Sequence, residues 1–196
     1  INFILELDTP DELEFMMADV NVDGAINILD VVQIVDIIIG RAAGNSRIAA
    51  PGAEALYEIL TTSFTGSNPS LDVALRYDGD LAGAQFTLSY DESRIVLGTP
   101  VLASDGATVF AKETAPGEMT VLVFNLSGDY LDLPDESFVS FPVELSDDRA
   151  TGQMQIDFIS AIAAGPFGQD ISASSRSASI DLNAVPDAYA LHQNFP

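Results

Sequence analysis

Five oxygen-bearing side chains recur at short intervals in residues 19–30, the segment DVNVDGAINILD. Counted from the first residue, they occupy loop positions 1, 3, 5, 9 and 12, with a glycine at position 6 and an isoleucine at position 8. Calcium binds about six to eight oxygens, which a short loop supplies by wrapping around the ion, and glycine permits the sharp turn. The spacing therefore predicts a calcium site. Its ligands are Asp19, Asn21, Asp23, the backbone carbonyl of Ala25, Asn27 (directly or through water) and Asp30.

The alternative interpretation of this segment is a solvated Asp- and Asn-rich turn that caps the following helix. The ligand spacing, the glycine, the apolar position 8 and the expected flanking helices all agree with a calcium loop, which favours calcium over a simple turn. The chain contains no cysteine, so disulfides, thiolate metal sites and cysteine nucleophiles are excluded.

Three elements are expected around the loop. Residues 1–8, INFILELD, alternate in a way that predicts a short strand. Thr9 as N-cap, Pro10 and a glutamate in the capping-box position then predict a helix from Pro10 to about Ala18. A second helix is expected over residues 28–39, ended by Gly40.

The second helix is apolar on most sides. Its polar residues Asp30, Gln33 and Asp36 fall in one narrow row, and nearly all others are Ile, Val or Leu. Such a helix is buried on most sides, so it must pack on the following domain or on another chain. Its length of roughly 18 Å is well short of a hydrocarbon core of roughly 30 Å, so no membrane span is predicted.

The segment DVNVDGAINILDVVQIVDIIIG resembles one calcium repeat of a dockerin, in which the ligand loop ends in Asp. Dockerins normally carry two such repeats, whereas this chain shows one. The resemblance implies a cohesin-type partner. Loop positions 10 and 11, often polar recognition residues in dockerins, are Ile28 and Leu29 here, so a contact made there would be hydrophobic.

Beyond a small, Gly-containing linker at residues 41–55, the pattern changes to short alternating runs separated by turn-formers. This pattern predicts an antiparallel β-sandwich or jelly roll, so the fold class is mainly β with a small N-terminal helix–calcium loop–helix unit. The segment from Leu81 to Asp91, with Ile95–Leu97 after it, resembles the early strands of a cohesin-like jelly roll, a likeness that covers residues 56–182. The runs are 71–77, 84–90, 121–123, 141–145, 154–158 and 180–182.

Residues 183–196 have no periodicity and are expected to form an extended tail. The end, YALHQNFP, resembles the opening of the C-terminal sorting domains used by type IX secretion. This likeness implies a secreted bacterial protein at the cell surface or outside the cell. The chain starts at Ile1 and not at Met, so this start is expected to be a processed end or the boundary of an expressed segment.

The composition narrows the function classes. A net charge of -23 would repel phosphate backbones and anionic lipid, which argues against nucleic-acid and peripheral-membrane roles. The single histidine, His192, lies in the tail with no neighbouring nucleophile, and no G-x-S-x-G, H-E-x-x-H or phosphate loop is present. A glycosidase-type carboxylate pair is not excluded among 30 acidic residues, but no catalytic residue is assigned and an enzyme is not expected.

Two alternatives remain open. A calcium-containing carbohydrate-binding or scaffold module would also be a β-sandwich, with a glycan as ligand. Such modules commonly bind glycans on exposed aromatic side chains, but this chain has no Trp. The core or a sheet face better explains the positions of the aromatic residues Tyr77, Phe86, Tyr90 and Phe158. Further calcium ions have candidate sites at acidic turns. These turns are 78–80, 127–129, 135–136 and 147–148.

The sequence thus favours a secreted, non-catalytic, calcium-stabilised structural or adhesive protein with partners that are other copies of itself or a cohesin- or dockerin-type protein. One chain carries both halves of a dockerin–cohesin pair, so we expect either closure within the chain or head-to-tail, filament-like association between chains. The expected strand at residues 1–8, suited to completing a neighbour's sheet, favours association between chains.

Overall fold

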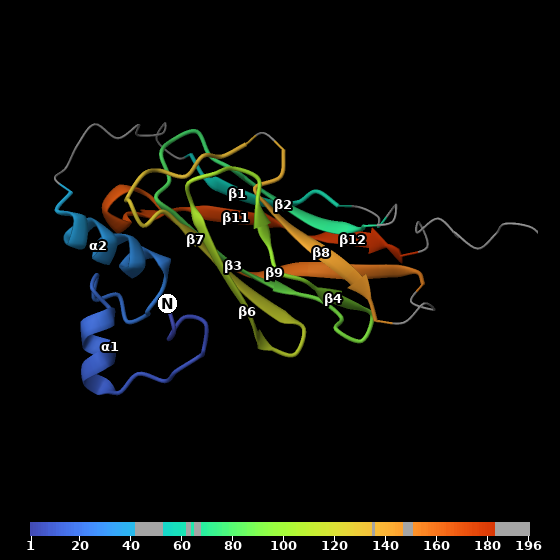
Figure 1. Cartoon of the computed structure of the whole chain (residues 1–196), viewed down its shortest axis with the longest axis horizontal. Coiled ribbons are helices and arrows are strands. Elements are labelled where there is room, and N and C mark those ends of the chain that lie inside the picture. Colours follow the sequence, from blue (N-terminus) through green and yellow to red (C-terminus); the bar gives the residue numbers. More distant parts are fainter. Residues whose placement is uncertain (42–52, 62–63, 65–67, 135, 147–150, 183–196) are drawn as a thin grey trace, which may run out of the picture.

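The computed structural model describes residues 1–41, 53–61, 64, 68–134, 136–146 and 151–182 (Figure 1). The chain forms two short helices followed by a sandwich of two β-sheets. The expected fold class is therefore confirmed. Most of the predicted linker and the whole tail at 183–196, His192 included, lie outside the described residues.

Residues 1–8 are not a strand, contrary to the expectation from their alternation. They form consecutive turns, in which the N–H of Leu5 donates to the carbonyl of Ile1 (3.0 Å) and the N–H of Leu7 donates to the carbonyl of Asn2 (2.9 Å). These local bonds satisfy the backbone without a neighbouring strand. Leu5 is buried and anchors the segment, whereas Leu7 is 59% exposed, so the alternation does not mark a buried face.

The helix before the loop, α1 (Glu12–Ala18), begins two residues later than predicted. Its cap is Asp11 rather than Thr9, because the Asp11 carboxylate accepts from the N–H of Glu14 (2.8 Å) and the Glu14 carboxylate accepts from the N–H of Asp11 (3.0 Å). The reciprocal pair satisfies two N–H groups that a helix start leaves unpaired. None of the α1 residues is buried.

The helix after the loop, α2 (Ile28–Ile39), has the predicted bounds. Asn27 caps its start, and Gly40 ends it in the left-handed conformation at φ 65°, where glycine carries no Cβ penalty. In Figure 1 both helices lie at one end of the sandwich. Within the described ranges, no helix is long and apolar enough to span a bilayer.

One sheet has the order β11-β1-β2-β8-β4, with β5 also paired to β8. All its pairs are antiparallel except β1 with β11, which is parallel. Its strands are β1 (Ala55–Ile59), β2 (Ser70–Arg76), β4 (Ile95–Leu97), β5 (Val101–Leu102), β8 (Val139–Leu145) and β11 (Ala173–Arg176).

The second sheet has the order β10-β9-β3-β7-β6, with β12 also paired to β9. It is antiparallel throughout. Its strands are β3 (Gly83–Ser89), β6 (Thr108–Ala115), β7 (Glu118–Phe124), β9 (Gln153–Ala164), β10 (Asp170–Ile171) and β12 (Ala178–Asp181), and a 3-10 turn, η1 (Pro166–Gly168), joins β9 to β10.

The main core lies between the two sheets and contains large, fully buried residues from both, such as Phe86 and Phe141. Tyr57 lies in this core, with its hydroxyl donating to the carbonyl of Ile162 (2.6 Å). A second, smaller core involves α2 and the outer side of the β9–β3–β7–β6 sheet. This second core positions the candidate site.

Candidate functional site

The loop of residues 19–30 is closed by the carboxylates at its two ends. The two oxygens of Asp19 accept from the N–H groups of Asp23 (3.1 Å) and Gly24 (3.0 Å). Asp30 Oδ1 accepts from the N–H groups of Val20 (2.8 Å) and residue 21 (3.3 Å), which ties position 12 back to the start of the loop. Carboxylate–backbone bonds therefore tie the first residue of the loop to its middle and the last residue to its start.

The remaining loop residues are positioned by bonds within the loop. Asn21 donates from Nδ2 to Asp23 Oδ2 (2.7 Å), and Asp23 Oδ1 accepts from the N–H of Ala25 (2.9 Å). Asn27 accepts at Oδ1 from the N–H of Leu29 (2.8 Å) as the cap of α2. Gly24, at φ 88°, makes the turn for which its position was singled out.

The side chains of the loop carry oxygen atoms of the type that a hard divalent cation binds. Asp19 and Asp30 are 7% and 0% exposed, and among the described residues neither forms an ion pair with a basic side chain. Within the described part of the chain, no group of three or more Asp, Glu, His or Cys side chains is gathered closely enough to hold a metal ion, because the loop carboxylates are turned to backbone N–H groups. Two buried carboxylates without cationic partners favour a cation ligand. Calcium binding stays a prediction.

Sheet register defines the surface on which α2 lies. Ala84 and Phe86 of β3 point into the main core, so Gly83 and Gln85 must point outward, because side chains alternate along a strand. The pairs across β3 extend this outer surface over β7, β9 and β6. We call it the docking face, and its residues are Gly83, Gln85, Phe110, Leu122, Phe124, Ile162 and Ala164.

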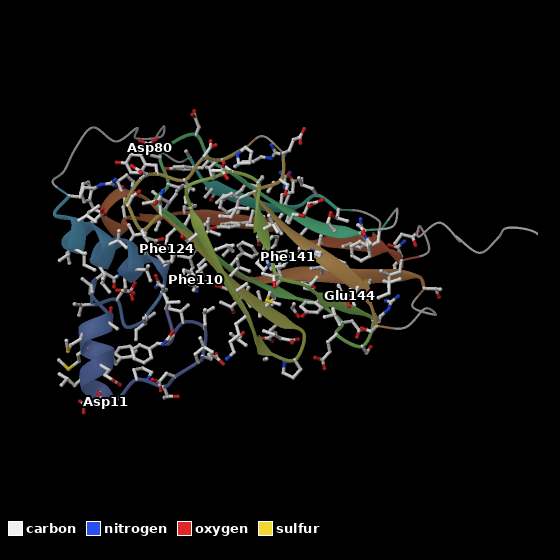
Figure 2. All side chains as sticks on the ribbon, in the orientation of Figure 1. Asp11, Asp80, Phe110, Phe124, Phe141 and Glu144 are labelled. Atoms are coloured by element: carbon white, nitrogen blue, oxygen red, sulfur yellow. The ribbon has the colours of Figure 1, made fainter. Side chains whose placement is uncertain are left out.

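Helix α2 covers the docking face with its apolar side. Ile28, Val32 and Val35 are buried in the second core, together with Leu122 and Phe124 of the sheet. Figure 2 shows Phe110 and Phe124 on the side toward the helices, and their rings stack with centroids 5.7 Å apart. Of the two expected alternatives, the following domain or another chain, the structure shows the first, although Ile37 and Ile38 near the end of the helix are 68% and 76% exposed.

Glycines let the helix approach the sandwich closely. A Cβ atom at Gly83 would lie 2.7 Å from Ile28 Cγ1 and 2.8 Å from Val32 Cγ2. A Cβ at Gly168 of η1 would meet the carbonyl oxygen of Leu29 at 2.5 Å, and one at Gly128 would collide with the end of Ile39. Contacts therefore follow α2 from its first turn to its last.

Polar bonds fix the helix at both ends. At its start, the N–H of Ile28 donates to Gln85 Oε1 (3.0 Å), a bond buried between sheet and helix. At its end, Arg41 Nε lies 3.5 Å from Asp36 Oδ1, and the Arg41 guanidinium lies 5.1 Å from the centroid of the Tyr130 ring. The row of polar residues on α2 is thus not a solvated face, since Asp30 and Asp36 are both buried.

Other sites considered from the sequence gain no support as binding sites. The acidic turns at 135–136 and 147–148 lie wholly or partly outside the described residues, as does His192. The turn at 127–129 is held by its own bonds, with Ser127 Oγ donating to Asp129 Oδ2 (2.6 Å). Among the described residues every aromatic side chain is buried or half-buried, so a carbohydrate module finds no exposed aromatic platform there.

The likeness of this chain to known proteins lies in its structure. No family model matches the sequence. No curated protein matches it either. Solved structures do match. The seventh ScaB type I cohesin from Pseudobacteroides cellulosolvens is 16% identical to this chain and superposes with a TM-score of 0.57; the match covers 71% of this chain and 98% of the cohesin chain. The sandwich has a cohesin-like fold.

Two further structures give the same result. A cohesin module from a Clostridium perfringens family 33 glycoside hydrolase is 16% identical with a TM-score of 0.55, and it covers 66% of this chain and 97% of its own. A Coh-OlpC–Doc435 complex from Clostridium thermocellum, a type I cohesin–dockerin complex, is 14% identical with a TM-score of 0.53, over 72% of this chain and 98% of that one. The cohesin-like resemblance expected from the sequence is thereby confirmed for the fold.

Residues of the sandwich that hold α2 were not found from the sequence. The sequence pattern includes Gln85 and Gly83 only as members of the cohesin-like run from Leu81 to Asp91. One signal was present: Gln85 is a polar residue in a strand whose neighbours on both sides, from Gly83 to Leu88, are otherwise mainly apolar. A buried amide in such a strand needs a partner, and here the partner is α2.

Proposed function

We propose that this chain is a non-catalytic protein-interaction module in which a calcium-stabilised, dockerin-like helix pair docks on a cohesin-like sandwich. The observation that carries the proposal is the packing of α2 on the docking face, with Gln85 bonded to the helix and Gly83 closely opposed to it. One of the structures similar to this chain is a cohesin–dockerin complex, which supports a partner of the same type.

Calcium has a conformational role in this proposal. The loop carries Asp19, Asp23 and Asp30 within 12 residues, and carboxylates drawn together around a site repel one another unless they are neutralised. An ion bound among them would remove that repulsion and fix the angle at which α2 leaves the loop. A metal clip of this kind is a substitute for the disulfides that the chain cannot form.

The partner outside the chain is a cohesin- or dockerin-type protein or a second copy, in an extracellular setting. Head-to-tail self-association stays a prediction, but residues 1–8 form turns rather than a free strand. The sandwich also already covers Ile28, Val32 and Val35 of α2, which leaves Ile37 and Ile38 exposed at the end of the helix. A second copy therefore has to compete with a docking unit tethered at an effective concentration of about millimolar. We expect a monomer in dilute solution and assembly at high concentration.

Calcium titration of the whole chain by calorimetry tests the proposal. We expect one site, lost in Asp19→Ala and retained in Asp105→Ala, a control that removes an equally acidic side chain from an exposed turn outside the loop. Thermal unfolding should shift upward with calcium in the parent and in the control. An absence of binding heat in the parent, together with equal melting temperatures in calcium and chelator, would contradict the calcium-stabilised part of the proposal.

Sedimentation velocity in calcium over a wide range of chain concentrations tests the interaction part. A monomer that assembles as concentration rises supports self-association. A chain that stays monomeric at the highest concentration contradicts self-association and leaves a heterologous partner. Binding to an immobilised glycan array would instead favour the carbohydrate-binding alternative.

A further inference from the structure

The first turn of α2 belongs to the calcium loop and to the docking face at the same time. Asn27 and Asp30 are loop positions 9 and 12, and Asp30 Oδ2 accepts from the N–H of Asn27 (2.9 Å). Ile28 lies between them, is 0% exposed, and donates its N–H to Gln85 Oε1 of the sheet. A shift of this turn would therefore move two of the expected ligands and the docking contact together.

The N–H group of Ile28 has its acceptor on the sheet and not within its own helix. An N–H group in the first turn of a helix has no acceptor within the helix, and a buried one is not reached by water. Gln85, 8% exposed, supplies the acceptor from a strand 57 residues away in the sequence. Without this acceptor the buried N–H is unpaired, which is costly enough for the turn to move or fray.

The sheet also leaves α2 little freedom to adjust. Gly83, on the same strand as Gln85, is so close to Ile28 and Val32 that a Cβ there would overlap with both side chains. In η1, just after the end of β9, Gly168 lies in similarly close contact with Leu29 and Gln33. The position of the first turn is therefore set by the sandwich and not by the loop alone.

We infer that Gln85 is a positioning residue for the calcium loop: its bond to Ile28 holds Asn27 and Asp30 where they can ligate the ion, so the affinity of the loop for calcium depends on docking against the sandwich. The inference rests on the proposed function, because it assumes that the loop binds calcium. Groups that orient metal ligands typically change metal affinity by about 10- to 100-fold when they are removed. Docking and calcium binding must then strengthen each other by the same factor.

The first test compares calcium affinities measured by calorimetry in four whole-chain proteins. Gln85→Leu removes the acceptor and should raise the Kd at least about tenfold. Gln85→Glu keeps an acceptor oxygen and should stay close to the parent. Thr87→Val is the matched control: Thr87 lies on the same strand and outer side, two residues along, but bonds to Thr120 and not to α2. It should leave the Kd unchanged.

The second test follows amide exchange at Ile28 in the parent with and without calcium. Calcium should slow this exchange by at least about tenfold, because the ion and the sheet hold the same turn. If Gln85→Leu binds calcium as tightly as the parent, the inference is overturned while the proposed calcium site stands. If the parent itself binds no calcium, the proposed function fails at its metal site. If Thr87→Val weakens binding as much as Gln85→Leu, the effect is a general loosening of the sheet and the inference is wrong.

Discussion

A side chain introduced at Gly83 should displace α2 and leave the sandwich folded. A Cβ there would lie 2.7 Å from Ile28 Cγ1 and 2.8 Å from Val32 Cγ2, whereas carbon atoms in contact lie about 3.5–4.0 Å apart. Gly83→Val adds two further carbons in a strand position that otherwise favours valine. Overpacking of this kind costs about 1–3 kcal/mol, and the strand preference offsets up to about 1 kcal/mol. We expect a net loss of about 1–2 kcal/mol, concentrated at the interface of α2 with the sheet.

Urea unfolding gives the total loss, and hydrogen exchange gives its location. In Gly83→Val, amides of α2 should exchange faster than in the parent, while amides of β2 and β8 in the opposite sheet keep their protection. Gly98→Val is the control, because Gly98 lies beside Pro142 in that opposite sheet and does not touch α2. The control should lose stability without loss of α2 protection.

A second-site change sharpens the result. Val32→Ala removes the Cγ2 atom that the new side chain meets, so it should cost less in the Gly83→Val background than in the parent, with a coupling of at least about 0.5 kcal/mol. Additive effects of the two substitutions, or full α2 protection in Gly83→Val, would refute the packing of α2 on the docking face.

Two other predictions concern the main core and the end of α2. Burial raises the pKa of Tyr57 above its ordinary value of 10.0, so the protonated hydroxyl stabilises the fold fully below pH 10, and this stabilisation is lost as the pH rises above 10. In urea unfolding, the free energy of unfolding should fall more steeply at alkaline pH in the parent than in Tyr57→Phe. Equal slopes in the two proteins would contradict this prediction. Arg41→Ala leaves the buried Asp36 carboxylate without its cationic partner, so it should lower the free energy of unfolding in urea by about 2 kcal/mol. A decrease below about 0.5 kcal/mol would show that this ion pair contributes little to stability.

Much of the fold could be predicted from local sequence patterns. The second helix is predicted with its observed bounds, because its apolar residues and the glycine that ends it both act within a few residues. The strands with regular alternation were found for the same reason, including those around Phe86 and Phe141. The start of α1 was misplaced by two residues, because Thr9 and Asp11 both fit a capping box and sequence alone does not rank them.

Features that depend on distant parts of the chain were not predictable in this way. The alternation in residues 1–8 was mistaken for a strand, because only the position of α2 decides that Leu5 alone is buried. Strand β6 escaped notice since, at the edge of its sheet, its residues are nearly all half-buried. For the candidate site, the six expected loop ligands follow from spacing. Gln85 stands out only as a polar residue in an apolar strand, and nothing near it in the sequence indicates its partner, the Ile28 N–H group 57 residues away.

The central claim is that the helix pair docks on its own sandwich. Its most direct test is a nuclear Overhauser effect between the Val32 methyl groups and the Gly83 α-protons, recorded in calcium on the unmodified chain. These groups are in contact, since a Cβ at Gly83 would lie only 2.8 Å from Val32 Cγ2. The signal should persist at full strength when labelled protein is mixed with about a tenfold excess of unlabelled protein. Docking within the chain keeps both groups on the same labelled molecule, so the unlabelled chains do not weaken the contact. Its absence, or its appearance only in an isotope-filtered experiment between labelled and unlabelled chains, would contradict docking within the chain.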